Sequence, residues 1–172
     1  MIQKEKTKIV TLEFLRRELV DDVNSYAYVE GDVMSQDAGH AKHQTFDILQ
    51  DGNRELCSRI IKLVLAKCRE ILYPFTKVGV ENNEAHNDVL TEPEKYTISM
   101  EVPESFSQTT ADYLEQLIHN LIVYRILFNW LSITKPESAA VWLTKADAVQ
   151  GEIASAKSIR MKRIHRKISV FP

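Results

Sequence analysis

The chain has 172 residues, of which 44% are hydrophobic and 27% are charged, with only five glycines and five prolines. This balance indicates one globular domain and excludes a disulfide-rich scaffold, a disordered chain and a glycine-rich phosphate-binding loop. The net charge of −2 is unevenly spread: residues 157–172 hold six of the 22 Lys and Arg residues and no acid, which leaves 16 basic against 24 acidic residues in 1–156.

The first expected element is a helix that begins near Thr11. Apolar residues recur there at steps of three and four, which is the spacing of one face of an amphipathic helix. The stripe consists of Leu12, Leu15, Leu19, Val23 and Tyr26. Gly31 is expected to end this helix.

A polar segment, residues 32–53, follows, with turn signals at Gly39 and at 51–53. His40 and His43 could ligate a metal together with a carboxylate, but no Cys or His follows at a second fixed interval. A calcium loop starting at Asp47 fails, because its twelfth position is Ser58 instead of Glu. We therefore favour a solvated or interface loop, with His40, His43 and Asp47 as candidate partner-binding residues.

A second helix is expected over residues 54–73, ended by Pro74. Its apolar stripe is Cys57, Ile60, Ile61, Val64, Cys68, Ile71 and Leu72. Cys57 and Cys68 are eleven residues apart on nearly one face, so they stand roughly 16 Å apart along the helix axis. A disulfide needs Cα atoms within about 7 Å, so we expect two free core cysteines in a reducing compartment.

One β element is expected between residues 76 and 103. Residues 96–102 alternate apolar and polar side chains, the pattern of a half-buried strand. The apolar positions are Tyr96, Ile98, Met100 and Val102. Thr76–Val80 is a candidate partner strand, which would make a hairpin with a long acidic loop.

Two further helices are expected at the C-terminal end. One runs from an N-cap at Thr109 or Thr110 to about Ile133, and its second half is apolar on more than one face, as in the centre of a bundle. Its longest apolar stretch has eleven residues, whereas a membrane span needs about 20, so no membrane is expected. Pro136 opens the last helix, to about 156, which should pack antiparallel to the third. His119 is interpreted as a core or interface histidine.

These elements predict a mainly α fold: a four-helix bundle-like domain with one β-hairpin insertion at about 76–103 and extended termini. The helical bundle with its hairpin would occupy residues 1–156. Residues 157–172 would form a basic C-terminal arm.

The C-terminal arm contains both basic and apolar candidate contact residues. Its cations could neutralise nucleic-acid phosphates, dock on an acidic protein surface, or simply be solvated at a helix end. The apolar end, 168–172, favours a protein partner and could add as a strand to another sheet. The candidate partner-binding residues here are Lys157, Arg160, Lys162, Arg163, Arg166, Lys167, Val170 and Phe171.

Six stretches of the chain form a recognisable set: Tyr26–Asp32, His43–Asp47, Gln50–Asn53, Leu72–Lys77, Leu117–Ile122 and Asn129–Glu137. They resemble stretches of small structural proteins of tailed phages and prophages of gut bacteria, of the head–tail connector or neck type. The similarity extends over most of the chain. The resemblance implies a non-enzymatic virion protein, assembled in the bacterial host cytoplasm, with no catalytic residues to carry over.

The resulting hypothesis is a connector or adaptor subunit that forms a ring at the neck. Its partners would be other copies of itself and the portal or neighbouring neck and tail proteins, with a DNA contact through the arm as a further option. No catalytic motif, cofactor, metal or small-molecule substrate is expected. The alternative hypothesis is a small nucleic-acid-binding or regulatory protein that acts through the basic arm.

Overall fold

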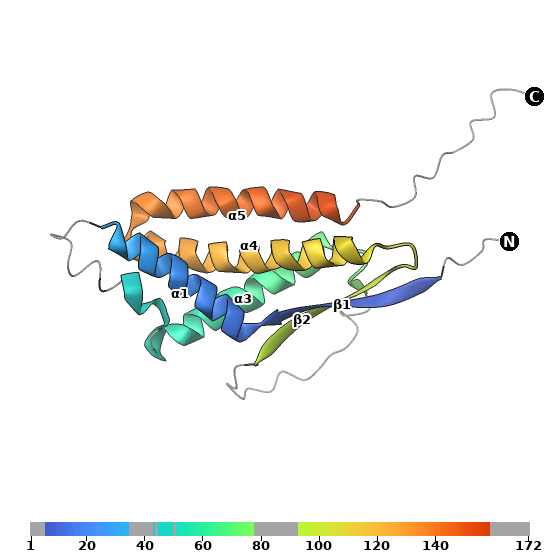
Figure 1. The fold of residues 1–172 in the computed structure, drawn as a ribbon, viewed down its shortest axis with the longest axis horizontal. Helices are drawn as coiled ribbons and strands as arrows, with labels where there is room; N and C mark the ends of the chain where they lie inside the picture. The colour runs from blue at the N-terminus through green and yellow to red at the C-terminus, as the bar shows by residue number, and fades with distance from the viewer. Residues whose placement is uncertain (1–5, 35–42, 44, 50, 78–92, 159–172) are drawn as a thin grey trace, which may run out of the picture.

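The computed structural model describes residues 6–34, 43, 45–49, 51–77 and 93–158. Figure 1 shows α4 in the middle, with α5 on one side and α1, α3 and the sheet on the other. The expected class, helical with one two-stranded antiparallel sheet, is confirmed. In chain order the elements are β1 (Thr7–Leu15), α1 (Arg16–Asp32), the short 3₁₀ helix η2 (Asp47–Leu49), α3 (Asp51–Ile71), β2 (Lys95–Pro103), α4 (Gln108–Thr134) and α5 (Pro136–Ala156).

The sheet pairs β1 with β2, so the expected partner strand at Thr76–Val80 is wrong. Leu12 lies opposite Ile98 and Phe14 opposite Tyr96, a pairing that spans more than 80 residues of chain. Thr76 instead belongs to the turn after α3, and residues 78–80 lie outside the described residues. That turn still touches the other edge of β2, where the backbone N–H of Glu101 donates to the carbonyl of Phe75 at 2.7 Å.

The start of the first helix was also predicted wrongly. Residues 7–15 are extended, and α1 begins at Arg16 directly after the strand, without a loop. Leu12 and Phe14 are buried on the inner face of the sheet, whereas Leu15 is 45% exposed. Leu12, Leu15 and Leu19 share a helical spacing by coincidence, while the β-branched residues just before them favour a strand. The buried stripe of α1 is Leu19, Val23, Ala27 and Gly31.

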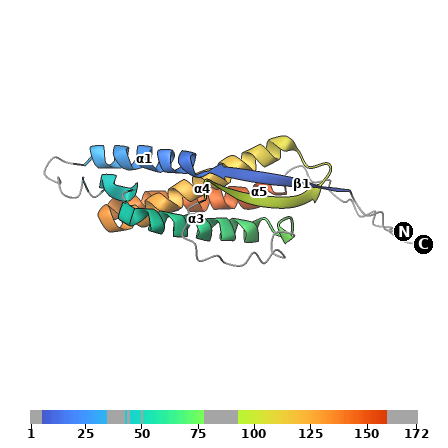
Figure 2. The ribbon, with the colours of Figure 1, turned by 90° about the horizontal axis from the view of Figure 1, so that it is seen from below.

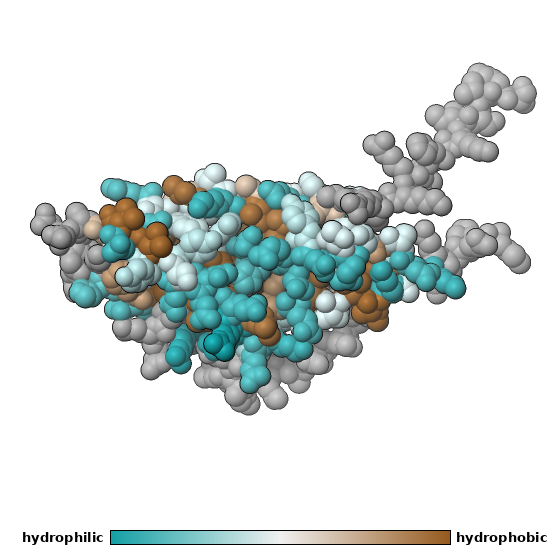
Figure 3. Space-filling view, viewed as in Figure 1, coloured by the Kyte–Doolittle hydropathy of each residue, from teal (hydrophilic) through white to brown (hydrophobic). Residues whose placement is uncertain are grey.

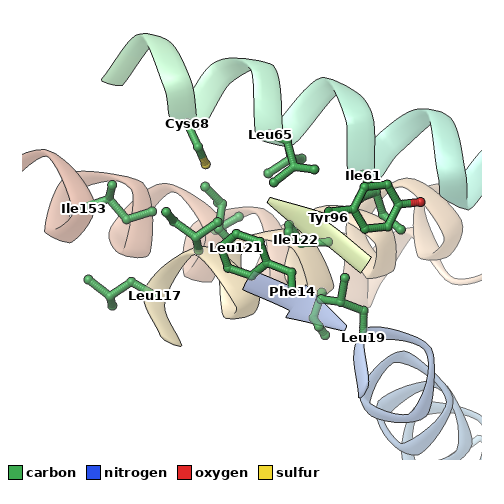
Figure 4. Packing of buried hydrophobic residues seen from close by; sticks show 14 of the residues in the cluster. Phe14, Leu19, Ile61, Leu65, Cys68, Tyr96, Leu117, Leu121, Ile122 and Ile153 are labelled. Carbon is green, nitrogen blue, oxygen red and sulfur yellow. The ribbon is translucent and has the colours of Figure 1, made fainter. Parts of the chain in front are cut away.

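The core gathers around α4, as its apolar composition predicts. Eleven of its residues are buried, and Figure 4 shows Leu121 and Ile122 facing the side chains of α3 and β1. The fourth predicted helix is confirmed as α5, which lies antiparallel against α4 (Figure 1). Its buried residues include Trp142, Ala146, Ile153 and Ala156, which recur at helical spacing on one face.

Helix α4 also has the length and composition of a membrane-spanning helix. In this fold it is the central helix of the core: Leu114, Ile118, Ile122 and Leu127 are fully buried. A central bundle helix is apolar on most sides for that reason. Its position therefore accounts for its hydropathy.

Helix α3 contributes the two cysteines. Both Cys57 and Cys68 are buried and free, as the helical spacing predicted. Burial raises the pKa of the Cys68 thiol to about 12, although the charges of Lys67 and Arg69 oppose the shift. This thiol stays protonated at neutral pH and acts as a small apolar core residue.

Candidate interaction surfaces

The structure describes two of the three predicted contact residues in the 32–53 segment. His40 lies outside the described residues, His43 is exposed, and Asp47 is half-buried at the start of η2. The backbone carbonyl of Asp47 accepts a hydrogen bond from the Asn53 side chain at 2.8 Å. Residues 51–53 were expected as a turn but form the start of α3, which begins at Asp51. Among the described residues no group of three or more His, Cys, Asp or Glu side chains could hold a metal.

Of the basic arm, the structure describes Lys157 and Ser158. The Lys157 ammonium donates to the carbonyl of Ile71 at 2.5 Å and lies 3.4 Å from the carbonyl of Tyr73. It therefore ties the end of α5 to the end of α3. The remaining predicted arm residues lie outside the described part of the chain: Arg160, Lys162, Arg163, Arg166, Lys167, Val170 and Phe171.

Phe46 docks the segment before η2 onto α1. A Cβ atom built on Gly31 would lie only 2.5 Å from Phe46 Cε1, so the ring sits where a larger residue would clash. Gly31 was expected to end the helix, and α1 ends one residue later, at Asp32. Without a side chain, Gly31 also allows this close approach. On the other side of the segment, Trp130 Nε1 donates to the Thr45 carbonyl at 3.2 Å.

The last two turns of α1 carry apolar side chains that the core does not cover. Val33 is 75% exposed, Tyr28 63% and Val29 58%. We call these three residues, together with Phe46, the α1 surface. Figure 3 shows brown, apolar surface at this end of the body, over the C-terminal end of α1.

A hollow of about 490 Å³ opens beside the α1 surface. Among the described residues, Asn24, Ser25, Tyr28 and Phe46 line it. The rings of Tyr28 and Phe46 stack at a centroid distance of 5.4 Å and an interplanar angle of 28°. An aromatic wall beside two short polar side chains can accept an apolar side chain from a partner, and aromatic residues are common anchors at protein interfaces.

The opposite flank of α1 is held to the α4–α5 turn through Glu30. The Lys135 ammonium lies 2.9 Å from Glu30 Oε2, and Trp142 Nε1 donates to Glu30 Oε1 at 3.0 Å. Burial alone would raise the pKa of Glu30. Hydrogen bonds from Lys135, Trp142 and Ser138, with the charge of Lys135, outweigh burial and lower it. The α1 surface is thus presented by a fixed helix.

His119 is half-buried and lies at an interface between helices. Its Nε2 is 2.8 Å from Asp22 Oδ2, a contact that joins α4 to α1. The expectation of a core or interface histidine fits this contact. The partner lies 97 residues away, so no local sequence pattern could reveal it.

The sequence reasoning missed the α1 surface. Tyr28 lies off the stripe that predicted the first helix, but Val29 and Val33 continue the steps of three and four residues from Tyr26, so the predicted stripe gave no reason to expect them on the surface. The residues that α1 buries are Leu19, Val23, Ala27 and Gly31. The small residues at 27 and 31 were the signal that the core contacts this other face of the helix. Phe46 could not be found in this way, because its role depends on the approach to Gly31.

Comparison with known proteins adds no relative. No family model, curated protein or solved structure matches this chain.

Proposed function

We propose that this chain is a non-enzymatic structural subunit of a tailed phage particle, a connector or adaptor that assembles in a ring at the neck. The observation that carries the proposal is the α1 surface. Three large apolar side chains at 58–75% exposure, beside an aromatic hollow, stand on a helix that the body holds fixed. Exposed apolar groups that gather in this way are typical of protein–protein contact.

The charge distribution supports contact between identical copies. Residues 1–156 have eight more acidic than basic side chains, whereas 157–172 have six basic and no acidic ones. Opposite charges on body and arm favour a head-to-tail contact, which closes into a ring when the rotation allows. The resemblance to phage neck proteins points to the same role.

Mass spectrometry of purified particles tests this function. The phage or prophage that encodes the chain is grown, and the copy number of the chain is measured relative to the portal protein. A fixed ratio close to that of the portal is expected for a connector ring. Absence from particles, with the chain abundant in the lysate, would overturn the proposal.

A second candidate function is nucleic-acid binding through the C-terminal arm. The cations of the arm are the one observation that favours it. Lys157 is bound to the carbonyl groups at the end of α3, so the five cations at 160–167 would have to carry the binding. Five phosphate contacts predict a loss of affinity for duplex DNA of several hundredfold to about a thousandfold between 50 and 200 mM salt. Affinity that hardly changes with salt, or no binding at all, would exclude this candidate.

A further inference from the structure

Strand β1 has an outer edge whose polar backbone groups can be assigned from the register. Ile9 lies opposite Glu101, and the Glu101 N–H points away from β1 to the carbonyl of Phe75. In an antiparallel pair, two residues directly opposite each other either both bond across the ladder or both point outward. The N–H and C=O groups of Thr7, Ile9, Thr11 and Glu13 therefore point away from β2.

Little of the described chain covers this edge. The N–H of Glu13 donates to the Glu115 carboxylate at 3.0 Å, while the outward backbone groups of Thr7, Ile9 and Thr11 find no partner among the described residues. Ile9 is 73% exposed. A row of unpaired N–H and C=O groups beside an exposed apolar residue is a template for another strand.

The other edge of the sheet differs. Arg69 donates to the Thr97 carbonyl at 3.1 Å, and the Phe75 carbonyl accepts from Glu101. Figure 2 shows β2 between β1 and the C-terminal end of α3. One edge is thus occupied by the segment after α3, and within the described part of the chain β1 is the edge open to a partner.

The sequence contains a segment suited to this edge. Ile168–Phe171 combines β-branched and aromatic residues, which favour strands, and has no internal proline. It follows the cations at 160–167, and the acceptor body is acidic overall. At the inner end of the open edge stands the Glu115 carboxylate. The segment therefore suits the edge of β1 in two ways: it favours the extended backbone of a strand, and the cations before it complement the acidic body.

We propose that Ile168–Phe171 of a second copy adds to the outer edge of β1 as a third strand. A second copy is favoured over the same chain by the position of Lys157. It is bound to the carbonyls of Ile71 and Tyr73, beside the segment that covers β2. The described end of the chain therefore lies on the β2 side of the sheet, opposite the outer edge of β1. The proposal rests on the assembly function above and assigns the contact between neighbours.

Photo-crosslinking of the full chain tests the pairing. A benzophenone amino acid replaces Ile9, and a 1:1 mixture of ¹⁴N and ¹⁵N chains is irradiated over roughly a thousandfold range of protein concentration. We expect crosslinks to residues 168–171 that increase with concentration, about half of them joining ¹⁴N to ¹⁵N chains. Crosslinks within single chains only, crosslinks only to other segments, or none at any concentration would each overturn the proposal.

A matched control places the same group at Thr97. This residue is exposed on the same face of the sheet, but the incoming strand would lie two strand spacings away, about 10 Å. We expect few crosslinks to 168–171 from Thr97. Equal yields from both positions would mean nonspecific contact and would overturn the pairing.

Two substitutions separate strand addition from simple proximity. In chains that carry the benzophenone at position 9, Thr11→Pro removes an outward N–H without removing a bond to β2, whereas Thr11→Val keeps that N–H. The crosslink yield should fall at least about fivefold for Thr11→Pro, the worth of one backbone hydrogen bond, and stay unchanged for Thr11→Val. Equal yields for both variants would contradict strand addition.

The crosslinking experiment and the particle experiment can fail separately. If the chain is present in particles but Ile9 does not crosslink to 168–171, the strand pairing fails and the virion function stands. If the chain is absent from particles, the virion function fails. Crosslinking of the purified chain then still decides whether the pairing exists.

Discussion

Helices α4 and α1 both carry many apolar residues, and they use them differently. In α4 eleven residues are buried, and its apolar faces are covered by the same chain except near the two ends, where Tyr113 and Ile133 are exposed. In α1 the buried stripe is narrow, while Tyr28, Val29 and Val33 remain exposed. Apolar content beyond the buried stripe therefore distinguishes a helix that only builds the core from one that also offers a surface.

The largest expected effect is a difference in the free energy of unfolding between a substitution in α4 and a substitution in α1. Leu121 of α4 is 1% exposed, whereas Val29 of α1 is 58% exposed. Leu121→Ala should lower the free energy of unfolding by about 3 kcal/mol because it leaves a cavity. Val29→Ala should change it by less than about 0.5 kcal/mol.

Urea unfolding of both variants checks this contrast. A loss at Val29 as large as that at Leu121 would mean that the α1 surface belongs to the core of the isolated chain, and the comparison between the helices would fail.

The second effect concerns how Phe46 docks on α1. Gly31→Ala places a Cβ 2.5 Å from the ring, so Phe46 must shift, which should cost about 1–3 kcal/mol of unfolding free energy. Gly151→Ala is the matched control in α5: a Cβ there meets nothing within 4 Å. It should stabilise by about 0.5–1 kcal/mol, the usual gain of alanine over glycine in a helix.

Thermal unfolding of the two alanine variants measures this difference. If Gly31→Ala stabilises the protein as much as Gly151→Ala does, Phe46 does not fix the segment to the helix. Repeating Gly31→Ala in a Phe46→Ala background should remove most of its cost.

The sequence predicted α3, α4, α5 and β2 to within about three residues, because long periodic stretches encode the face that each element buries. It failed at β1, where Leu12, Leu15 and Leu19 have a helical spacing. The partner of β2 is far away in the chain, and local periodicity carries no information on such pairing. The contacts of Glu30 with Lys135 and of His119 with Asp22 were hidden for the same reason.

The third prediction concerns Glu30, which fixes α1 to the α4–α5 turn. Its pKa in the folded protein lies below the ordinary value of 4.5, so its stabilisation is fully present above 4.5 and is lost as the pH falls below it. Glu30→Gln should cost about 1–2 kcal/mol of unfolding free energy at pH 7, the worth of a charge-assisted hydrogen bond. This cost should shrink at acid pH.

Chemical unfolding of Glu30→Gln at a series of pH values tests the sign of the effect. Glu13→Gln is the control, because the Glu13–Lys95 pair is half exposed and solvent screens it. No stability change is expected from that variant at any pH. A cost at Glu30 that grows toward acid pH would contradict the proposed role of its charge.

The last pair of substitutions should have the smallest effect on stability, and it tests the central claim. This claim is that a partner covers the α1 surface in the particle. Val33 in the C-cap of α1 and Leu63 on α3 are 75% and 71% exposed, so Val33→Glu and Leu63→Glu should leave the fold intact. Each tagged variant is expressed during phage growth, and its share in purified particles relative to the native chain is measured. We expect Val33→Glu to be excluded by about tenfold or more, because burying an unpaired charge is costly, and Leu63→Glu to enter normally. Equal entry of both variants would contradict the claim.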